Sequence, residues 1–301
     1  MTVAAAPPKR VLVVGATGVF GGRLARHLAR HGPAMDLLVS SRDGPRADAL
    51  AAEIGATGLA LHTGHGLAER LRTLRCFAVI DCSGPFQRLS HGTARAAVAS
   101  GAHAIDLADA RDYLLGYSAA LDDAARAQGV AALAGASSTP ALSGAVARAL
   151  TAGWSRVDML DIAITPGGRS EIGRAALEAV ISCVGRDVPV WRDGRVADTT
   201  GWGDATVVDM PGLGRRRVAA VETVDAEHLG PKLGVRTRVT FRAGLESAAE
   251  QHGLELLARL RRWGWLGDPA PLLPLLLAGR RITRLPTGDH GGMRVGARGI
   301  D

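Results

Sequence analysis

Three glycines near the start of the chain, Gly15, Gly18 and Gly21, are separated by two residues each. They follow the apolar run 10–14, which predicts a strand, and they open a predicted helix over 18–31. In such a turn one glycine allows the tight bend, one lets the backbone approach a pyrophosphate and one lets the helix pack closely. The spacing therefore predicts a dinucleotide site at the helix start, with a tight turn that holds no ligand as the alternative. The predicted contacts are Gly15, Thr17, Gly18, Val19, Phe20 and Gly21.

The end of the second predicted strand, 36–41, indicates which dinucleotide is bound. An NAD site usually carries Asp or Glu there, which holds the ribose 2′-hydroxyl. This sequence has Ser41 and Arg42 instead, followed by Asp43. A guanidinium can pair with a 2′-phosphate, and a serine hydroxyl can add a donor. We therefore expect NADP(H) to be favoured over NAD(H), and the alternative is an exposed Arg42 with Asp43 on the ribose.

A second loop at the same edge of the sheet is Ser83, Gly84, Pro85 and Phe86, after the predicted strand 77–82. Ligands of open α/β sheets bind beyond the carboxyl ends of the strands, so we expect this loop to contact the cofactor. Phe86 would pack on it. The alternative is a Gly-Pro turn with a core phenylalanine.

The sequence shows no convincing general acid, so the catalytic residues are left unassigned. His91 could donate a proton at neutral pH, although an exposed histidine at a helix end is the alternative. Asp109 and Arg111 follow the predicted strand 103–107 and could orient a polar substrate or form an internal ion pair. No metal site is predicted, because the three cysteines lack CxxC spacing.

The candidate substrate contacts are Ser137, Ser138 and Thr139, which precede Pro140 and a predicted helix over 141–151. Thr139 fits an N-cap, with proline at the first helical position. The free N–H groups there could hold a substrate carboxylate or the nicotinamide amide. A plain helix start is the alternative.

These candidates need a scaffold that brings strand ends together. The first half alternates apolar strands with helices, and the strands lack strict alternation of polar and apolar residues, as in a parallel sheet covered on both faces. Right-handed crossovers then give a doubly wound Rossmann domain. The apolar side of helix 18–31 is predicted to be Phe20, Leu24 and Leu28. The predicted strands are 10–14, 36–41, 58–62, 77–82, 103–107 and 130–134.

The second half predicts a mixed-sheet α/β domain for substrate binding or dimerisation. We expect a hinge near Gly153 and domains of 1–152 and 153–301. Leu254, Leu257, Leu260 and Trp263 form the expected apolar side of an amphipathic helix within 244–265. The predicted elements are strands 157–165, 188–191 and 235–241 and helix 170–184.

Composition excludes several classes of protein. The chain has 301 residues and a net charge of +7, but its arginines are spread along the sequence and aromatics make up only 4%, so no nucleic-acid partner is expected. No apolar run approaches the roughly 20 residues of a membrane helix. The start carries no secretory signal, and the odd number of cysteines fits a reducing cytoplasm. The apolar run 271–277 predicts a buried helix rather than a membrane-surface or oligomer contact.

The Tyr-x-x-x-Lys catalysis of short-chain dehydrogenases is excluded. The only tyrosines are Tyr113 and Tyr117, and the residues four positions later are Tyr117 and Leu121. This leaves a different reductase family or a cofactor sensor without catalysis.

Six segments in order resemble saccharopine dehydrogenase-like oxidoreductases, and most closely the bacterial branch often fused to a domain of unknown function. The resemblance implies an N-terminal NAD(P)-binding domain, a mixed α/β second domain, and hydride chemistry on imines or related carbonyl compounds. Family members run beyond the Gly-Gly-Met strand, whereas this sequence ends at Asp301, so an exposed face covered by a second copy is expected. The segments are 15–22, 79–87, 101–109, 135–144, 235–245 and 291–293.

The sequence thus predicts an NADPH-dependent oxidoreductase that transfers hydride to or from a C=N or C=O group of a small molecule in an interdomain cleft. Water, His91 or Asp109 would supply the proton. The alternatives are an NADP(H) sensor without catalysis and a membrane-surface member of the family.

Overall fold

The computed structural model describes residues 8–171, 173–283 and 288–301. The chain divides into two units. The first runs to residue 108 and includes 112–136, and the second holds 109–111 and 137–301. The division precedes helix α6 (Ser143–Leu150) rather than Gly153, because Ala147 of α6 is buried in the second unit's core with Leu160 and Leu229.

The first unit is built on a six-stranded sheet in the order β3-β2-β1-β4-β5-β6, with every pair parallel. This order reverses direction after β1, which confirms the predicted doubly wound Rossmann topology. The carboxyl ends of β1 and β4 therefore lie side by side. The strands are β1 Lys9–Val14, β2 Met35–Ser41, β3 Thr57–Ala60, β4 Ala78–Asp81, β5 His103–Asp106 and β6 Ala132–Leu133.

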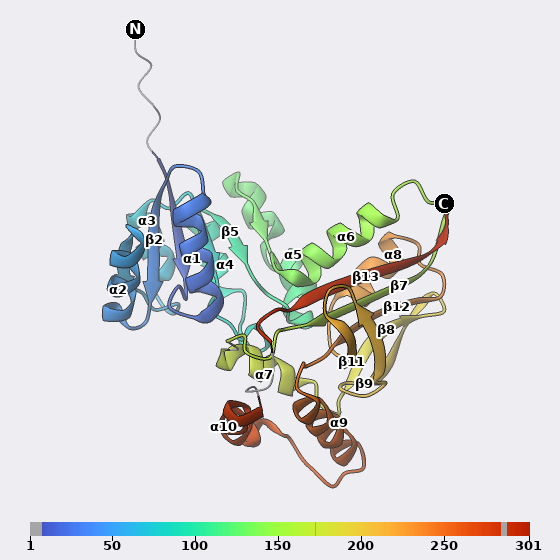
Figure 1. The fold of residues 1–301 in the computed structure, drawn as a ribbon. Helices are drawn as coiled ribbons and strands as arrows, with labels where there is room; N and C mark the ends of the chain where they lie inside the picture. Colours follow the sequence, from blue (N-terminus) through green and yellow to red (C-terminus); the bar gives the residue numbers. More distant parts are fainter. Residues whose placement is uncertain (1–7, 172, 284–287) are drawn as a thin grey trace. The chain divides into compact units, whose positions relative to one another are not determined.

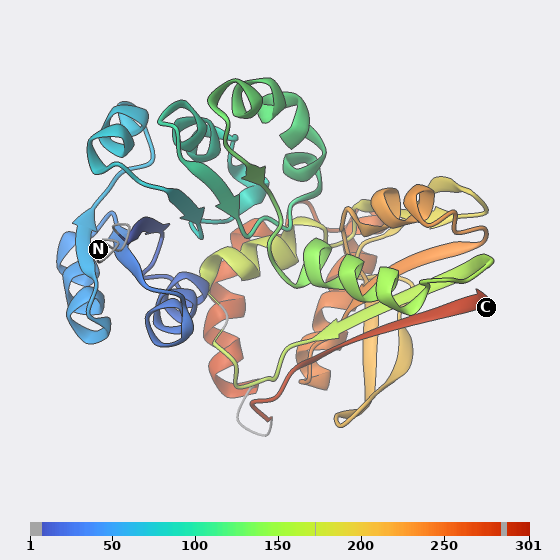
Figure 2. The ribbon, with the colours of Figure 1, turned by 90° about the horizontal axis from the view of Figure 1, so that it is seen from above.

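Helices cover both faces of this sheet. α1 and α2 lie on one face, and α3, α4 and α5 lie on the other (Figure 2). A short 3-10 turn, Phe86–Arg88, follows β4. The helices are α1 Val19–His31, α2 Gly44–Ile54, α3 Leu67–Leu74, α4 Gly92–Ala99 and α5 Arg111–Gln128 (Figure 1).

Helix α1 packs on the sheet through small residues. Its buried residues are Gly21, Gly22 and Ala25, whereas Phe20 is 56% exposed. The prediction that Phe20 lies on the buried side is therefore wrong. The glycines and the alanine let the helix axis approach the strands, and this close approach leaves Phe20 outside the contact.

The second unit contains a seven-stranded mixed sheet. Its order is β10-β11-β12-β7-β13, with β8 beside β12 and β9 beside β8. β12 runs parallel to β7 and antiparallel to β8, which confirms the predicted mixed α/β domain. The strands are β7 Arg156–Thr165, β8 Asp187–Arg192, β9 Arg195–Thr200, β10 Thr206–Met210, β11 Gly214–Ala220, β12 Arg238–Ala243 and β13 Gly292–Ile300.

One core of this unit lies between the sheet and two helices. Ala147 of α6 and Leu229 of α8 pack on Leu160, Ile162 and Phe241 of the sheet. The remaining helices are α7 Arg174–Ser182, α8 Asp225–Lys232, α9 Ala248–Arg262 and α10 Leu273–Thr283, with short turns at Ser138–Leu142 and Ala270–Leu272.

A second core lies against α9, where Leu254 and Ala258 pack with the fully buried Trp202. The prediction that Trp263 continues this apolar side is wrong, because α9 ends at Arg262 and Trp263 is 62% exposed beside Trp265. Leu273 is buried and Leu275 is 69% exposed in the apolar run of α10.

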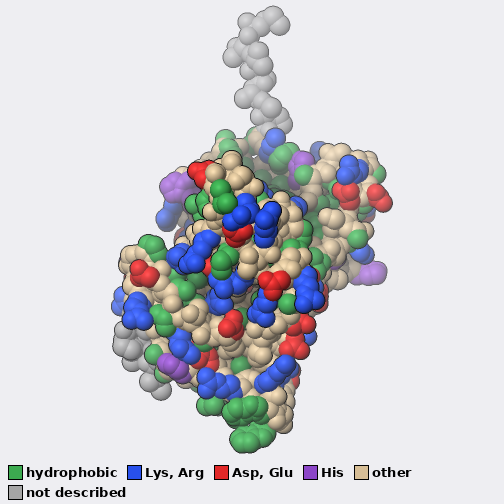
Figure 3. All heavy atoms as spheres, turned by 90° about the vertical axis from the view of Figure 1, so that its right-hand side faces the viewer, with side chains coloured by type: hydrophobic (Ala, Val, Ile, Leu, Met, Phe, Trp, Pro, Cys, Tyr) green, Lys and Arg blue, Asp and Glu red, His purple; other side chains and the backbone are tan. Residues whose placement is uncertain are grey.

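Basic side chains are dispersed among acidic ones over the face in Figure 3 and form no single stripe on it. Within the described residues, every helix is too short or too polar to cross a membrane.

Candidate functional site

Two glycines of the predicted turn are required by close backbone packing. Gly15 has a φ of +73°, and a Cβ there would lie 2.9 Å from the Cα of Ser83. A Cβ at Gly21 would lie only 2.3 Å from the carbonyl oxygen of Gly15. These two positions therefore shape the turn between β1 and α1 and press it against the loop after β4.

Gly18 is different, because it is exposed and forms the N-cap of α1. A Cβ there would meet only the Gly15 carbonyl oxygen, at 3.2 Å. No side chain caps the helix, and its first turn carries no acidic residue. The first bond within the helix runs from the Gly22 N–H to the Gly18 oxygen at 2.8 Å, so the preceding N–H groups of the first turn are open to an anion. The cradle fits a pyrophosphate.

The end of β2 is tied to this turn. The Thr17 hydroxyl donates to Ser41 Oγ at 2.9 Å, and the Asp43 N–H donates to the same oxygen at 3.2 Å. Asp43 caps α2, since its Oδ1 accepts the Arg46 N–H at 3.3 Å. Arg42 is exposed, and its guanidinium contacts no hydrogen-bond or ion-pair partner within the described part of the chain.

Arg46 is a candidate that the sequence analysis missed. Its Nη2 donates to the Thr17 carbonyl oxygen at 3.3 Å from the first turn of α2. With Thr17 and Gly18 it lines a cavity of about 290 Å³. Its place four residues after Arg42, at the start of a helix that follows β2, is the signal that could have identified it.

The loop after β4 is held by Asp81. This buried carboxylate accepts the Ser83 N–H at 2.9 Å and also the Ser83 hydroxyl. Phe86 is buried, and its ring packs edge-on against Tyr113 with centroids 5.3 Å apart. This is the core arrangement named as the alternative, and cofactor contact through Ser83, Gly84, Pro85 and Phe86 stays a prediction.

Asp106 organises the neighbouring strand ends. It is 1% exposed and accepts hydrogen bonds from the Ala108 N–H at 3.0 Å, the Gly135 N–H at 2.9 Å and the Tyr113 hydroxyl at 3.0 Å. Burial raises the pKa of Asp106, although its hydrogen bonds oppose the change. Burial and the nearby Asp106 raise the pKa of Tyr113 as well. The Asp106–Tyr113 pair is therefore a buried structural link between loops.

The two weak catalytic candidates lie in different surroundings. His91 is half-buried, and its Nε2 lies 2.8 Å from the Tyr113 carbonyl oxygen, with its ring beside Tyr113 and Tyr117. Asp109 is exposed. Arg111 forms an ion pair with Glu227 of α8. The role of His91 or Asp109 in proton transfer stays a prediction.

Thr139 does not cap α6, so the predicted N-cap is wrong. The helix begins at Ser143 after the turn Ser138–Leu142, and Leu142 occupies the cap position. Thr139 Oγ1 instead donates to Asp225 Oδ2 at 3.0 Å, because the chain brings α8 beside this turn. Ser137 Oγ donates to the Thr139 oxygen at 2.6 Å, while Ser138 is exposed.

Asp225 was not singled out by the sequence. Its side chain is fully buried, and this burial raises its pKa, although hydrogen bonds from Ser143 and Thr139 oppose the change. A neutral, buried carboxyl group thus holds the turn that contains the predicted substrate contacts.

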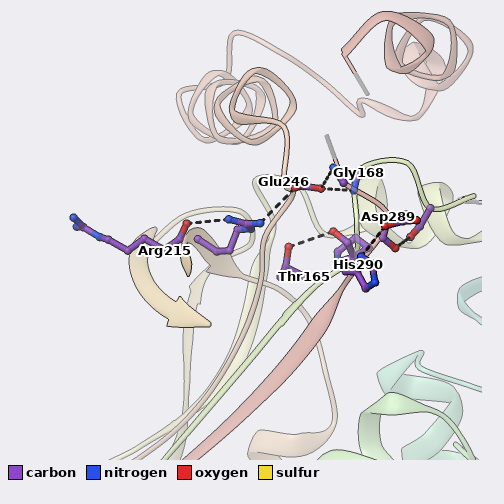
Figure 4. Close-up of polar contacts among 10 residues, drawn as sticks. Thr165, Gly168, Arg215, Glu246, Asp289 and His290 are labelled. Atoms are coloured by element: carbon purple, nitrogen blue, oxygen red, sulfur yellow. Dashed lines mark hydrogen bonds and ion pairs between the residues drawn. The ribbon is translucent and has the colours of Figure 1, made fainter. Parts of the chain in front are cut away.

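Glu246 joins two loops of the second unit (Figure 4). Its Oε2 accepts the Gly168 N–H at 2.8 Å and the Gly288 N–H at 3.0 Å, and Arg216 donates to Oε1 at 3.4 Å. Partial burial alone would raise the pKa of Glu246, but the two backbone hydrogen bonds and Arg216 lower it. His290 lies in the same region, 2.7 Å from Asp289. In the described ranges, no group of histidine, cysteine and acidic side chains is arranged to hold a metal ion.

The parallel sheet and its uncapped glycine turn define a Rossmann-type dinucleotide-binding domain. Residues 11–133 match the model of the saccharopine dehydrogenase NADP binding domain. The first unit is therefore a domain of that family, which confirms the resemblance found in the sequence. No curated protein gave a match.

Solved structures share the fold. Apo saccharopine dehydrogenase (L-Glu forming) from Saccharomyces cerevisiae matches with a TM-score of 0.59 at 14% identity, over 78% of this chain. This chain spans 55% of the length of that yeast protein. Myo-inositol 2-dehydrogenase from Lactobacillus plantarum matches with a TM-score of 0.43 at 13% identity, over 79% of this chain and 70% of its own. Biliverdin reductase from Synechocystis matches with a TM-score of 0.41 at 15% identity, over 79% of this chain and 73% of its own.

Proposed function

We propose that this chain is an NADPH-dependent oxidoreductase of the saccharopine dehydrogenase-like type. It transfers hydride between the nicotinamide and a C=N or C=O group of a small molecule. The observation that carries the proposal is the open N-terminus of α1 within a domain that matches the NADP-binding family. The free cysteines Cys76, Cys82 and Cys183 support a cytoplasmic location.

The residues divide the work of holding the cofactor. The N–H groups that follow Gly18 bind the pyrophosphate, and Arg42 with Ser41 binds the 2′-phosphate. Arg46 adds a second positive charge beside Thr17. Asp43 is engaged as the cap of α2, which favours the 2′-phosphate over the ribose hydroxyl as the recognised group.

The bound nicotinamide supplies the hydride, and the protein supplies orientation and a proton. Reduction of a C=N or C=O bond places the hydride on carbon and the proton on nitrogen or oxygen. Water, Asp109 or His91 donates that proton. Ser137, Ser138 and Thr139 contact the substrate, and the link from Thr139 to Asp225 keeps their turn in one conformation.

The test is NADPH oxidation with a panel of imines, ketones and aldehydes. We expect turnover of at least one member of the panel, and we expect Gly18→Val to abolish it. The Asp109→Asn variant then asks whether this carboxylate is the proton source, because its loss would flatten the acid limb of the pH profile.

A cofactor sensor is the second candidate. It is favoured by the use of strand-end groups for structure, since Asp106 is buried against Tyr113 and His91 is bonded to the Tyr113 carbonyl oxygen. If NADPH and NADP⁺ bind with different affinities while no compound turns over, the chain is a sensor and the oxidoreductase proposal is wrong.

A further inference from the structure

Strand β12 presents its polar residues on one face of the second unit's sheet. Residues two apart on a strand share a face, so Arg238, Thr240 and Arg242 lie together, while Val239 and Phe241 face the buried core. This polar face therefore carries two arginines from one strand.

A third arginine lies directly beside them. In the antiparallel pair of β8 and β12, Arg192 is the register partner of Arg238. Directly opposite residues project from the same face with Cβ atoms about 5 Å apart, and like charges in this arrangement repel. An anion between them would turn this repulsion into attraction.

The carboxylates of this face only partly satisfy the arginines. Asp161 of β7 accepts Arg238 Nη2 at 3.2 Å and the Thr240 hydroxyl at 2.7 Å. Asp204 accepts Arg242 Nη2 at 2.9 Å, and its own side chain is 54% exposed. Both ion pairs use the Nη2 end of the guanidinium.

The other guanidinium donors remain unused. The Nε atoms of Arg238 and Arg242 are buried and have no hydrogen-bond partner. Arg192 is exposed, and its guanidinium contacts no partner in the described residues. A buried donor without an acceptor is unfavourable, so these atoms are suited to a ligand that brings acceptor oxygens.

These groups surround a cavity of about 220 Å³. Arg192, Arg238, Thr240, Arg242 and Asp204 are among the residues that line it. At about 30 Å³ for each water, the cavity has room for roughly seven water molecules, which is the size of a small metabolite rather than of a dinucleotide.

We propose that this cavity is a binding site for a small-molecule anion that carries a carboxylate or phosphoryl group. The guanidinium groups of Arg192, Arg238 and Arg242 bind its oxygens through charge-assisted hydrogen bonds. The site lies wholly within the second unit and is separate from the glycine turn of the first.

The experiment is calorimetric titration of the full chain with two probes, pyrophosphate for the phosphoryl group and citrate for the carboxylate. The Gly18→Val background removes the glycine turn as a competing anion site. We expect at least one probe to bind, and the tighter probe identifies the preferred group. Arg192→Gln should weaken its binding at least tenfold. The matched control is Arg186→Gln, which removes an exposed arginine of the same unit that lies outside this cavity.

A second variant tests the buried donors. Arg242→Lys keeps the charge but removes the Nε donor, so we expect it to weaken the same probe. The absence of binding by both probes, or equal affinities in the parent and in Arg192→Gln, would overturn the proposal. Sedimentation velocity supplies a further check, because a dimer that dissociates in Arg192→Gln would show that a second copy covers this face and that the anion site is wrong.

Discussion

The hydroxyl of Thr17 donates a 2.9 Å hydrogen bond to Ser41 Oγ and so joins the glycine turn to the end of β2. The first segment approaches the pyrophosphate in the proposed complex, and the second carries the 2′-phosphate contact. Because Arg46 also bonds the Thr17 carbonyl oxygen, affinity and cofactor choice depend on one connected structure.

Gly18→Val should abolish detectable NADPH binding while the fold survives. The new side chain would fill the approach to the N–H groups of α1, yet a Cβ at this position meets only the Gly15 oxygen, at 3.2 Å. Calorimetry measures the affinity and circular dichroism the fold. Gly64→Val is the matched control, since a Cβ at Gly64 has no neighbour within 4 Å. Unchanged NADPH affinity in Gly18→Val would show that the turn is not the binding site.

Ser138→Ala should lower turnover more than stability, because Ser138 is exposed and its hydroxyl is proposed to contact the substrate. One neutral hydrogen bond contributes about 0.5–1.5 kcal/mol, which corresponds to a decrease in kcat/KM of roughly 2- to 13-fold. Steady-state kinetics on a substrate found in the panel measures the effect, with Ser118→Ala on exposed α5 as control. Identical kinetics in Ser138→Ala and the parent would exclude this contact.

Glu246→Gln should destabilise the protein at neutral pH and lose this effect in acid. The pKa of Glu246 is lowered in the folded state, so its carboxylate contributes stability above its unfolded pKa of about 4.3, and this contribution disappears as the pH falls through the folded value. We expect a loss of about 1–3 kcal/mol in the free energy of unfolding at neutral pH. Urea denaturation at several pH values measures it, and Glu171→Gln, an exposed carboxylate, is the control. A loss that is the same at all pH values would contradict the assignment.

Asp225→Asn should show the opposite pH dependence. The pKa of Asp225 is raised by burial, so the folded state holds its proton more tightly and loses stability as the pH rises from about 3.9 through the folded value. The asparagine stays neutral and can still accept from Thr139. Relative to the parent, the variant should therefore gain stability with rising pH, by about 1.4 kcal/mol for each unit of pKa displacement. Urea denaturation over the same pH series measures this, with the exposed Asp193→Asn as control, and a pH-independent difference would show that Asp225 is not held neutral.

The first unit could be predicted because its signals are local. Short apolar runs identified the parallel strands, and the glycine spacing placed the turn at the start of α1. The buried side of α1 could not be predicted in the same way. Periodicity groups Phe20 with the leucines, but the close approach of Gly21 and Gly22 to the sheet decides which residues are buried.

The second unit was harder because its polar contacts join distant parts of the sequence. Thr139 has a good local reason to cap a helix, yet its partner Asp225 lies 86 residues later. Glu246 bonds Gly168, which is 78 residues away. No local pattern reveals such pairs, and the register of Arg192 beside Arg238 likewise follows only from the order of the strands.

Arg42→Ala should separate the two cofactors. A charge-assisted hydrogen bond contributes roughly 1.5–3 kcal/mol, so the loss of the guanidinium should weaken NADPH binding by about ten- to a hundredfold and leave NADH binding nearly unchanged. Added salt should weaken NADPH binding more than NADH binding, because the phosphate contact is exposed. Arg70→Ala on α3 removes another exposed arginine and should change neither affinity.

The most direct measurement of the central claim is a titration of the unmodified protein with NADPH and with NADH under the same conditions. Selection by Arg42 and Ser41 predicts that NADPH binds at least tenfold more tightly. If NADH binds as tightly as NADPH, Arg42 is an ordinary surface residue, the 2′-phosphate is not recognised at the end of β2, and the proposed NADPH dependence is wrong.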